Sequence, residues 1–168
     1  MSHAQGSEGA GAAVAIRKAR RSDALALEPI IRHFAARNAV LPRTTGSIVC
    51  AIRDFWVAEV DGRVAGCCAL TVIDEDLVEV RTLVVDEATQ GLGLGRKLVE
   101  ACIAEAESLG FSTVFALTRV VGFFERMGFS PVPMSSLPQK VWLDCVHCPS
   151  FPNCDEVAMA RPLHPTGR

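Results

Sequence analysis

Hydrophobic residues follow two different spacings along this chain, and these spacings predict a mixture of strands and helices. After the polar pair Ser22-Asp23, apolar side chains recur at helical spacing as far as Phe34, with Pro29 expected to kink or restart the helix. Elsewhere, short apolar runs are bounded by turn signals, such as the Asp61-Gly62 pair that is typical of a two-residue hairpin. We predict strands at 14–17, 55–60, 63–73, 77–85, 113–118, 141–143 and 156–160, and helices at 22–34, 47–54, 93–109 and 121–127.

The order of these elements predicts the fold class. One strand, two helices, three antiparallel strands, a helix, a strand, a helix and the last strands are typical of an α+β fold. We expect a central mixed, mostly antiparallel sheet flanked by helices. The 168 residues suit one domain. We expect this domain to span 14–168, after a small polar tail at 1–13 that we expect to be disordered.

The charge balance argues against some classes of function. The chain has 17 Lys and Arg against 19 Asp and Glu, a net charge of -2. It therefore has no general basic field for nucleic acid or for an anionic membrane. No apolar run approaches the length of a membrane span, and the first dozen residues carry no apolar signal core. We expect a cytoplasmic protein with neither nucleic acid nor membrane as a partner.

A glycine-rich loop follows the apolar run at 77–85 and leads directly into a predicted helix. Gly93 and Gly95 let the backbone approach a ligand closely, and the N–H groups at the start of a helix favour negative charge. The loop therefore predicts a phosphate-binding site. A dinucleotide-binding motif does not fit, because Leu98 stands where that motif needs a third glycine. The Gly-Lys-Ser/Thr of a P-loop is also absent.

The spacing of Gln90, Gly93 and Gly95 resembles the Gln/Arg-x-x-Gly-x-Gly/Ala pattern of the GNAT superfamily of N-acetyltransferases. The resemblance extends over about 16–163 and implies a GNAT fold with acetyl-CoA as co-substrate. In that family the end of the central strand holds the pantetheine arm, and the loop holds the pyrophosphate. The cofactor-binding residues that this resemblance implies are Leu83, Val84, Val85, Gln90, Gly91, Leu92, Gly93, Leu94, Gly95 and Arg96.

A second motif, at 122–129, resembles the GNAT segment Phe-Tyr-x-x-x-Gly-Phe. Phe124 stands where many members have a tyrosine that protonates the departing CoA thiolate, and this chain contains no tyrosine. Water or another group must protonate the thiolate, or it leaves unprotonated, which a thiol pKa of about 8.5 permits. We expect Phe124 to pack in the core, with contact to the cofactor as a second role.

Glu79 occupies the position on the central strand where several GNAT enzymes carry a catalytic glutamate. An amine must lose a proton before it attacks a thioester, and a half-buried carboxylate has a raised pKa suited to accept that proton. The alternative is a structural glutamate paired with Arg81, two residues along the same face of the strand.

Four segments resemble the short bacterial N-acetylglutamate synthases, which start arginine biosynthesis: 41–59, 76–85, 114–129 and 137–159. The resemblance implies a dicarboxylic amino acid as acceptor, held by Arg43, Arg81 and Lys140. Arginine suits this role because its planar fork binds carboxylate in a bidentate way. The alternatives are surface ion pairs for Arg43 and Lys140 and a Glu79 partner for Arg81. One departure is Arg119, which stands where relatives often have tyrosine.

Seven cysteines are present, an odd number that argues against a disulfide framework. Cys50, Cys67, Cys68 and Cys102 lie in apolar runs and are expected to be core residues. The other three form the pattern Cys145-x-x-Cys148-x5-Cys154. This spacing permits a zinc site, but a fourth ligand is missing, so a reduced structural loop without metal is the default expectation.

Together these patterns predict acetyl transfer from acetyl-CoA to the α-amine of glutamate or a similar amino acid. One alternative is a GNAT enzyme that acetylates a polyamine, an antibiotic or a protein N-terminus. Another is a non-catalytic acyl-CoA sensor or adaptor whose cysteine loop binds a partner. The oligomeric state is left open, a homodimer included.

Overall fold

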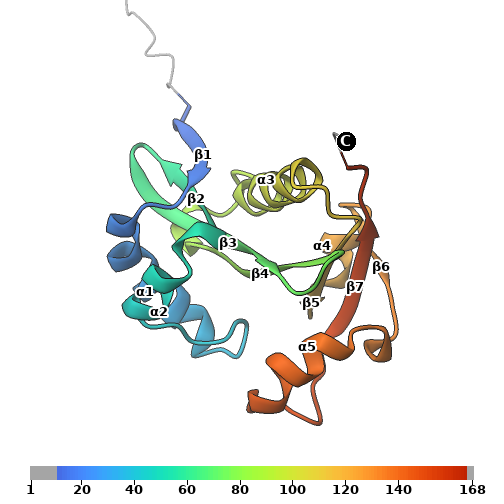
Figure 1. Cartoon of the computed structure of the whole chain (residues 1–168). Coiled ribbons are helices and arrows are strands. Elements are labelled where there is room, and N and C mark those ends of the chain that lie inside the picture. Colours follow the sequence, from blue (N-terminus) through green and yellow to red (C-terminus); the bar gives the residue numbers. More distant parts are fainter. Residues whose placement is uncertain (1–10, 166–168) are drawn as a thin grey trace, which may run out of the picture.

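A seven-stranded sheet forms the centre of the protein, in the order β1-β2-β3-β4-β5-β7-β6. The structure is a computed structural model, and it describes residues 11–165 (Figure 1). Neighbouring strands are antiparallel except for β4 and β5, which run parallel. The predicted α+β class with a mixed, mostly antiparallel sheet is therefore confirmed. The strands are β1 (Val14–Lys18), β2 (Phe55–Val60), β3 (Arg63–Val72), β4 (Leu77–Val85), β5 (Thr113–Thr118), β6 (Ser130–Pro131) and β7 (Val157–Pro162).

Helices cover both faces of the sheet because its central strands carry apolar side chains on both sides. Two of them, α3 (Leu94–Ser108) and α4 (Val121–Glu125), share one core with Val78 and Val80 of β4. On the opposite face, α1 (Ala24–Ala35) and α2 (Thr45–Cys50) pack on β2 and β3 (Figure 1). The last helix, α5 (Pro138–Leu143), lies below the sheet in Figure 1, near β7.

The turns and the long helix form where the sequence predicts them. Asp61 and Gly62 both have positive φ, 49° and 76°, as a two-residue hairpin turn requires. Gly93, at φ 70°, precedes α3, and Gly110, at φ 90°, follows it. Leu109 is an exception, because it is 61% exposed rather than buried. Leu109 lies just after the last turn of α3. The side chains that the helix buries are Leu94, Leu98, Val99, Cys102, Ile103 and Ala106.

A β-bulge reverses the alternation of side chains near the end of β4. Cys67 pairs with Val84 and Ala69 with Arg81, so β4 has one extra residue in this interval, and Thr82 has φ 53°. Before the bulge, Val80 points to α3 and Glu79 and Arg81 point to the other face. After it, Val84 packs on the α1–α2 side instead. The bulge bends β4 at the point where the strand leaves its neighbour β5.

The prediction of a strand at 141–143 is wrong, because these residues belong to α5. Pro138 occupies the first turn of this helix, where its missing N–H has no cost. Three apolar residues cannot distinguish a strand from a helix. The position beside β5 in the sheet is taken by β7.

Three smaller predictions are also corrected. The helix predicted at 47–54 begins earlier, at Thr45, and Thr44 caps it by accepting a hydrogen bond on its hydroxyl from the Ser47 N–H at 3.1 Å. The first helix is continuous through Pro29. Cys50 is exposed at the end of α2, while Cys67, Cys68 and Cys102 are buried as expected.

Of the predicted tail at 1–13, residues 1–10 lie outside the described part of the chain. Ala13 donates a hydrogen bond from its N–H to the carboxylate of Asp61 at 2.9 Å, and its carbonyl accepts one from the Asp61 N–H at 2.8 Å. The first described strand is thus joined to the β2–β3 turn. Disorder of the tail stays a prediction.

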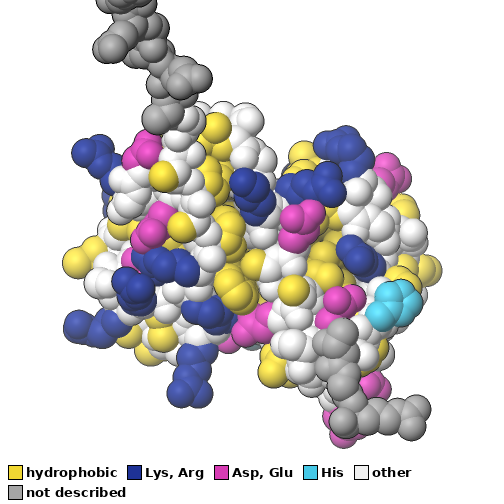
Figure 2. Space-filling view, turned by 90° about the horizontal axis from the view of Figure 1, so that it is seen from above, with side chains coloured by type: hydrophobic (Ala, Val, Ile, Leu, Met, Phe, Trp, Pro, Cys, Tyr) yellow, Lys and Arg dark blue, Asp and Glu magenta, His cyan; other side chains and the backbone are white. Residues whose placement is uncertain are grey.

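Basic and acidic side chains are mixed over the face that Figure 2 shows. This agrees with the small net charge of -2. No helix among residues 11–165 is long and apolar enough to cross a membrane.

Gly66 tests how closely β3 approaches the bulged end of β4. A Cβ at this position would lie 2.5 Å from the Val84 carbonyl oxygen and 3.0 Å from the Val85 Cα, both of them backbone atoms. We expect Gly66→Ala to lower the free energy of unfolding by about 1–3 kcal/mol, as overpacking does elsewhere. Urea unfolding would measure the change. Gly46→Ala is the matched control, because its Cβ would meet only Thr44 at 3.9 Å, and it should not destabilise the protein. Equal stability of the two variants would contradict the expectation.

Candidate functional site

The strands β4 and β5 separate after a short stretch of pairing, and a cavity opens between their ends. They pair only at Leu77–Glu79 with Thr113–Phe115, although β4 continues to Val85 and β5 to Thr118. The cavity has a volume of about 430 Å³. Its walls come from these strand ends, from the loop at 35–42 after α1, and from the segment at 140–156. Beyond Glu79, β4 still pairs with β3, but its edge toward β5 has no strand partner and borders the cavity.

Glu79 lies in the wall of this cavity and is only 3% exposed. The Lys140 ammonium donates a hydrogen bond to Glu79 Oε2 at 2.9 Å, and Arg81 Nη1 lies 3.6 Å from the same oxygen. Burial raises the pKa of Glu79 above its ordinary value, while the charges of Lys140 and Arg81 oppose this shift. The side chain is more deeply buried than its predicted half-buried position, because α5 covers it.

Two cations and two carboxylates form one cluster here. The Lys140 ammonium also donates to Asp144 Oδ2 at 2.8 Å, and Arg81 Nη1 donates to the same oxygen at 2.8 Å. Desolvation works against ionisation of Asp144, yet Lys140 and Arg81 hold its pKa below the usual range. The cluster formed by Glu79, Arg81, Lys140 and Asp144 is therefore charged but balanced.

Asp144 is a site residue that the sequence reasoning missed. Its spacing from Lys140 is i, i+4, which brings two side chains together on a helix. That signal could have been found only if the segment had been predicted as a helix rather than a strand.

Arg43 lies next to this cluster, on the far side of the bulge. Its Nε donates to the Thr82 hydroxyl at 3.3 Å, and its guanidinium lies over the Phe55 ring at 5.4 Å from the centroid. No carboxylate among residues 11–165 lies within ion-pairing distance of it. Desolvation lowers the pKa of Arg43, and the nearby charge of Arg81 adds to this shift. This half-buried guanidinium could therefore bind the carboxylate of a ligand.

The glycine-rich loop lies open at the start of α3. Gly91 and Gly93 have φ of 89° and 70°, and a Cβ at either position would meet nothing within 4 Å. The 15-residue α3 follows directly, and the N–H groups of its first turn have no carbonyl partner inside the helix. Gln90, Gly91, Leu92 and Arg96 are exposed, and Arg96 pairs with Glu100 at 2.7 Å. The loop can therefore present its backbone to a phosphate.

Phe124 packs between two other aromatic rings, as expected. Its ring lies edge-on to Phe123 and to Phe129, with centroids 5.1 Å apart in both pairs. It is 4% exposed and also lines the cavity. Phe123 in turn lies 3.7 Å from the position of a Cβ on Gly95. This helix therefore supports both the cavity and the glycine-rich loop.

Arg119, the departure from the family pattern, connects three segments around the cavity. It donates to the Asn38 carbonyl at 2.7 Å and to Asp155 at 2.7 Å, and it lies 3.5 Å from Glu156. It thus joins the end of β5 to the loop after α1 and to the segment before β7.

Cys145, Cys148 and Cys154 all line the cavity and are partly exposed free thiols. Burial raises the pKa of Cys145 and of Cys154. In the described part of the chain, no three His, Cys, Asp or Glu side chains are arranged to hold a metal ion.

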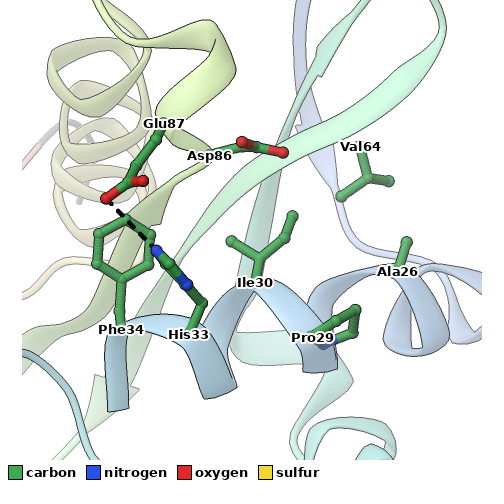
Figure 3. A pocket seen from close by; sticks show the side chains of 8 residues that line it. All are labelled: Ala26, Pro29, Ile30, His33, Phe34, Val64, Asp86 and Glu87. Atoms are coloured by element: carbon green, nitrogen blue, oxygen red, sulfur yellow. Dashed lines mark ion pairs between the residues drawn. The ribbon is translucent and has the colours of Figure 1, made fainter. Parts of the chain in front are cut away.

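A second hollow, of about 440 Å³, lies between α1 and the residues that follow β4 (Figure 3). Pro29, Ile30 and Phe34 form much of its lining, and Glu87 at its edge pairs with His33 at 3.4 Å. Both side chains of this pair are about half exposed. The cavity between β4 and β5 is the stronger candidate site, because it contains a buried carboxylate and cations.

A parallel strand pair that parts beside a glycine-rich loop and a helix N-terminus is the arrangement that the resemblance to acyl-CoA-dependent acyltransferases implies. Residues 32–129 match the acetyltransferase (GNAT) family, and the chain belongs to this family. Its resemblance to that family, drawn from the loop spacing, is confirmed.

Known relatives agree with this assignment. The chain is 41% identical to an uncharacterised N-acetyltransferase of Chlorobaculum tepidum, over 88% of this chain and 96% of that protein. It is 35% identical to the amino-acid acetyltransferase of Mycobacterium tuberculosis, over 76% of this chain and 74% of that protein. The N-acetylglutamate synthase of Neisseria gonorrhoeae, solved with coenzyme A and N-acetyl-glutamate, matches with a TM-score of 0.82 and 28% identity. That match covers 92% of this chain and 36% of the synthase. The protein is an N-acetyltransferase that uses acetyl-CoA.

Proposed function

We propose that the enzyme acetylates the α-amine of glutamate or a closely similar amino acid, the first step of arginine biosynthesis. The observation that carries this proposal is the cavity wall, where a buried carboxylate, Glu79, lies beside Arg81, and where Arg43, without a carboxylate partner among the described residues, contacts Thr82 of the same strand. A base and anion-binding forks in one place suit an acceptor that has both an amine and carboxylates. The relatives named amino-acid acetyltransferase support the same class of acceptor.

The residues around the cavity fit acetyl-CoA. Leu83, Val84 and Val85 lie on the part of β4 that β5 leaves unpaired, so their backbone groups could bind the amides of the pantetheine arm. Gly91 and Gly93 leave open space where side chains would stand, and α3 begins directly behind them. We assign the pyrophosphate to this loop, from Gln90 to Arg96, because its backbone N–H groups and the helix dipole favour an anion.

Bound acetyl-CoA supplies the acetyl group as a reactive thioester. We assign to Glu79 the proton that the acceptor's amine must lose, accepted directly or through one water. Lys140 and Arg81 hold the Glu79 carboxylate, while burial keeps its pKa above the ordinary value. Without a tyrosine in the chain, the thiolate takes its proton from water or leaves as the anion.

The two arginines are the proposed carboxylate contacts, with different local surroundings. Arg43 has no carboxylate partner among the described residues, so a substrate carboxylate would satisfy it. Arg81 already contacts Asp144 and Glu79. Lys140 is 4% exposed and engages two carboxylates, so holding Glu79 in place is its stronger role. Direct contact between Lys140 and substrate stays a prediction.

Gly93→Val tests the cofactor assignment. A valine side chain would fill the space proposed for phosphate and would also be strained at φ 70°. We expect at least tenfold weaker coenzyme A binding by calorimetry. Gly110→Val is the matched control, because Gly110 has φ 90° and equally open surroundings at the other end of α3. Both variants should lose similar stability, but only the first should lose affinity. Unchanged affinity in folded Gly93→Val would remove the loop from the site.

Glu79→Gln tests the base. We expect turnover to fall by about 10²–10⁴-fold, the usual effect of losing a general base, with little change in coenzyme A affinity. In the wild type, kcat/KM should fall as the pH drops through the raised pKa of Glu79, since the protonated carboxyl cannot accept a proton. Steady-state rates between pH 5 and pH 9 would show this limb, and the glutamine variant should lack it. A near-normal rate in the variant across this range would make Glu79 structural.

A coenzyme A release assay across the twenty amino acids, with spermidine and a peptide, tests the acceptor. We expect glutamate to be preferred, or failing that glutamine or aspartate. Arg43→Ala should raise the acceptor KM by roughly tenfold or more, since a charge-assisted contact is worth about 1.5–3 kcal/mol. Arg53→Ala removes an exposed arginine nearby and should change nothing. Faster acetylation of spermidine or the peptide would exclude the amino-acid acceptor.

A further inference from the structure

The segment at 138–156 covers the acceptor side of the cavity, and few contacts of its described side chains with the rest of the protein are apolar. None of its described side chains belongs to a hydrophobic core cluster, and Lys140 is the only buried one among them. Trp142 and Leu143 are 75% and 56% exposed. Polar contacts hold the segment instead: Lys140 with Glu79, Asp144 with Arg81, and Asp155 with Arg119. Contacts of this kind can be exchanged for others without the loss of a packed core.

Asp144 makes the contact that a substrate carboxylate would need. Both it and the acceptor's carboxylate are anions suited to the Arg81 guanidinium, and Asp144 already lies 2.8 Å from Arg81 Nη1. Of the Arg81 guanidinium it contacts only this one nitrogen, its other partner being Lys140 Nζ at 2.8 Å, whereas a free carboxylate can use two donors of the fork at once. A bidentate acceptor would therefore gain a bond that Asp144 does not make.

Charge balance decides which carboxylate leaves. With an acceptor carboxylate on Arg81, three anions would share Arg81 and Lys140. Glu79 cannot withdraw, because it lies on a central strand and is 3% exposed. The Asp144 side chain is 28% exposed and follows the last residue of α5, on the segment whose described side chains make no core contacts. Asp144 is therefore the group that can yield.

We propose that Asp144 is an internal competitor of the acceptor, so that acceptor binding exchanges one carboxylate for another on Arg81 and releases the contact between Asp144 and β4. This rests on the proposed function, because it takes the acceptor to be a carboxylate. Asp144 then sets specificity: an acceptor without a carboxylate cannot replace it. The exchange also lowers affinity for every acceptor, since each must first displace Asp144.

Glutarate is the probe that tests this competition, because it has the two carboxylates of glutamate and no amine. Its binding is measured by calorimetry with saturating coenzyme A, so no turnover is needed. Asp144→Asn keeps the size and one acceptor oxygen but removes the charge. We expect it to bind glutarate about three- to thirtyfold more tightly, the range for a partly exposed charged contact. Asp144→Glu, which restores a carboxylate, should bind like the wild type.

Asp155→Asn is the matched control. It removes the same charge from the same segment, but Asp155 pairs with Arg119 rather than Arg81, and it should leave glutarate binding unchanged. Asp144→Ser replaces Asp144→Asn if circular dichroism shows that the asparagine variant is unfolded. Glutamate KM should fall in parallel with the glutarate dissociation constant, while kcat changes less.

The proposal is overturned if Asp144→Asn binds glutarate as tightly as the wild type or more weakly. It is also overturned if neither the variant nor the wild type binds glutarate. A rise in glutamate KM with unchanged glutarate binding also overturns it, because Asp144 would then hold the acceptor's ammonium. These results are separate from those of the acceptor assay. Tighter glutarate binding by Asp144→Asn without glutamate turnover would support the competition and reject the proposed reaction. Glutamate turnover without tighter glutarate binding by the variant would reject only the competition.

Discussion

The separation of β4 from β5 is the constraint on which the rest of the site depends. Two parallel strands in the middle of a sheet would normally bond along their whole length, and here they bond only as far as Glu79. The extra residue at the bulge bends β4 away, and it also turns Arg81 and Val84 toward the same face. The backbone that the sheet leaves unused becomes the surface available to a ligand. The glycine-rich loop and the N-terminus of α3 follow within ten residues of the end of β4. The pantetheine and pyrophosphate parts of the acetyl-CoA site that we propose therefore lie next to each other along the chain.

The charged cluster is better understood as positioning than as stabilisation. Taking Glu79 and Lys140 out of water costs free energy that their attraction only partly returns, so a buried pair is weak evidence for stability. What the pair does is hold a carboxylate in one orientation beside a cavity. Asp144 and Arg81 complete the balance of charge at the side that faces solvent. Glu79 and Arg81 lie on the central strand β4, whereas Lys140 and Asp144 lie on the segment at 138–156, none of whose described side chains belongs to a hydrophobic core cluster. This difference would let an acceptor enter without disturbing the base.

Much of the fold could be predicted from sequence, since its signals are local. The helical spacing after Gly93, the glycine-rich loop before it and the Asp61-Gly62 turn depend on neighbouring residues, and each was found where it was expected. The candidate residues Glu79 and Arg81 were also placed correctly on one face of one strand, because strand geometry repeats every two residues. The segment at 141–143 failed, since a short apolar run has no distinctive period and the helix there depends on contacts made elsewhere.

The sequence by itself determined the order of strands and helices as far as α4, the glycine-rich loop and the types of side chain available for chemistry. Only the tertiary structure decided which of those side chains meet. Glu79 and Lys140 are 61 positions apart, and Arg81 and Asp144 are 63 apart. Arg119 reaches across 81 positions to Asn38. Contacts at such separations depend on how far β4 bends, on where α5 returns below the sheet, and on which strand takes the place beside β5. None of these leaves a local pattern, because each is set by the packing of the whole chain.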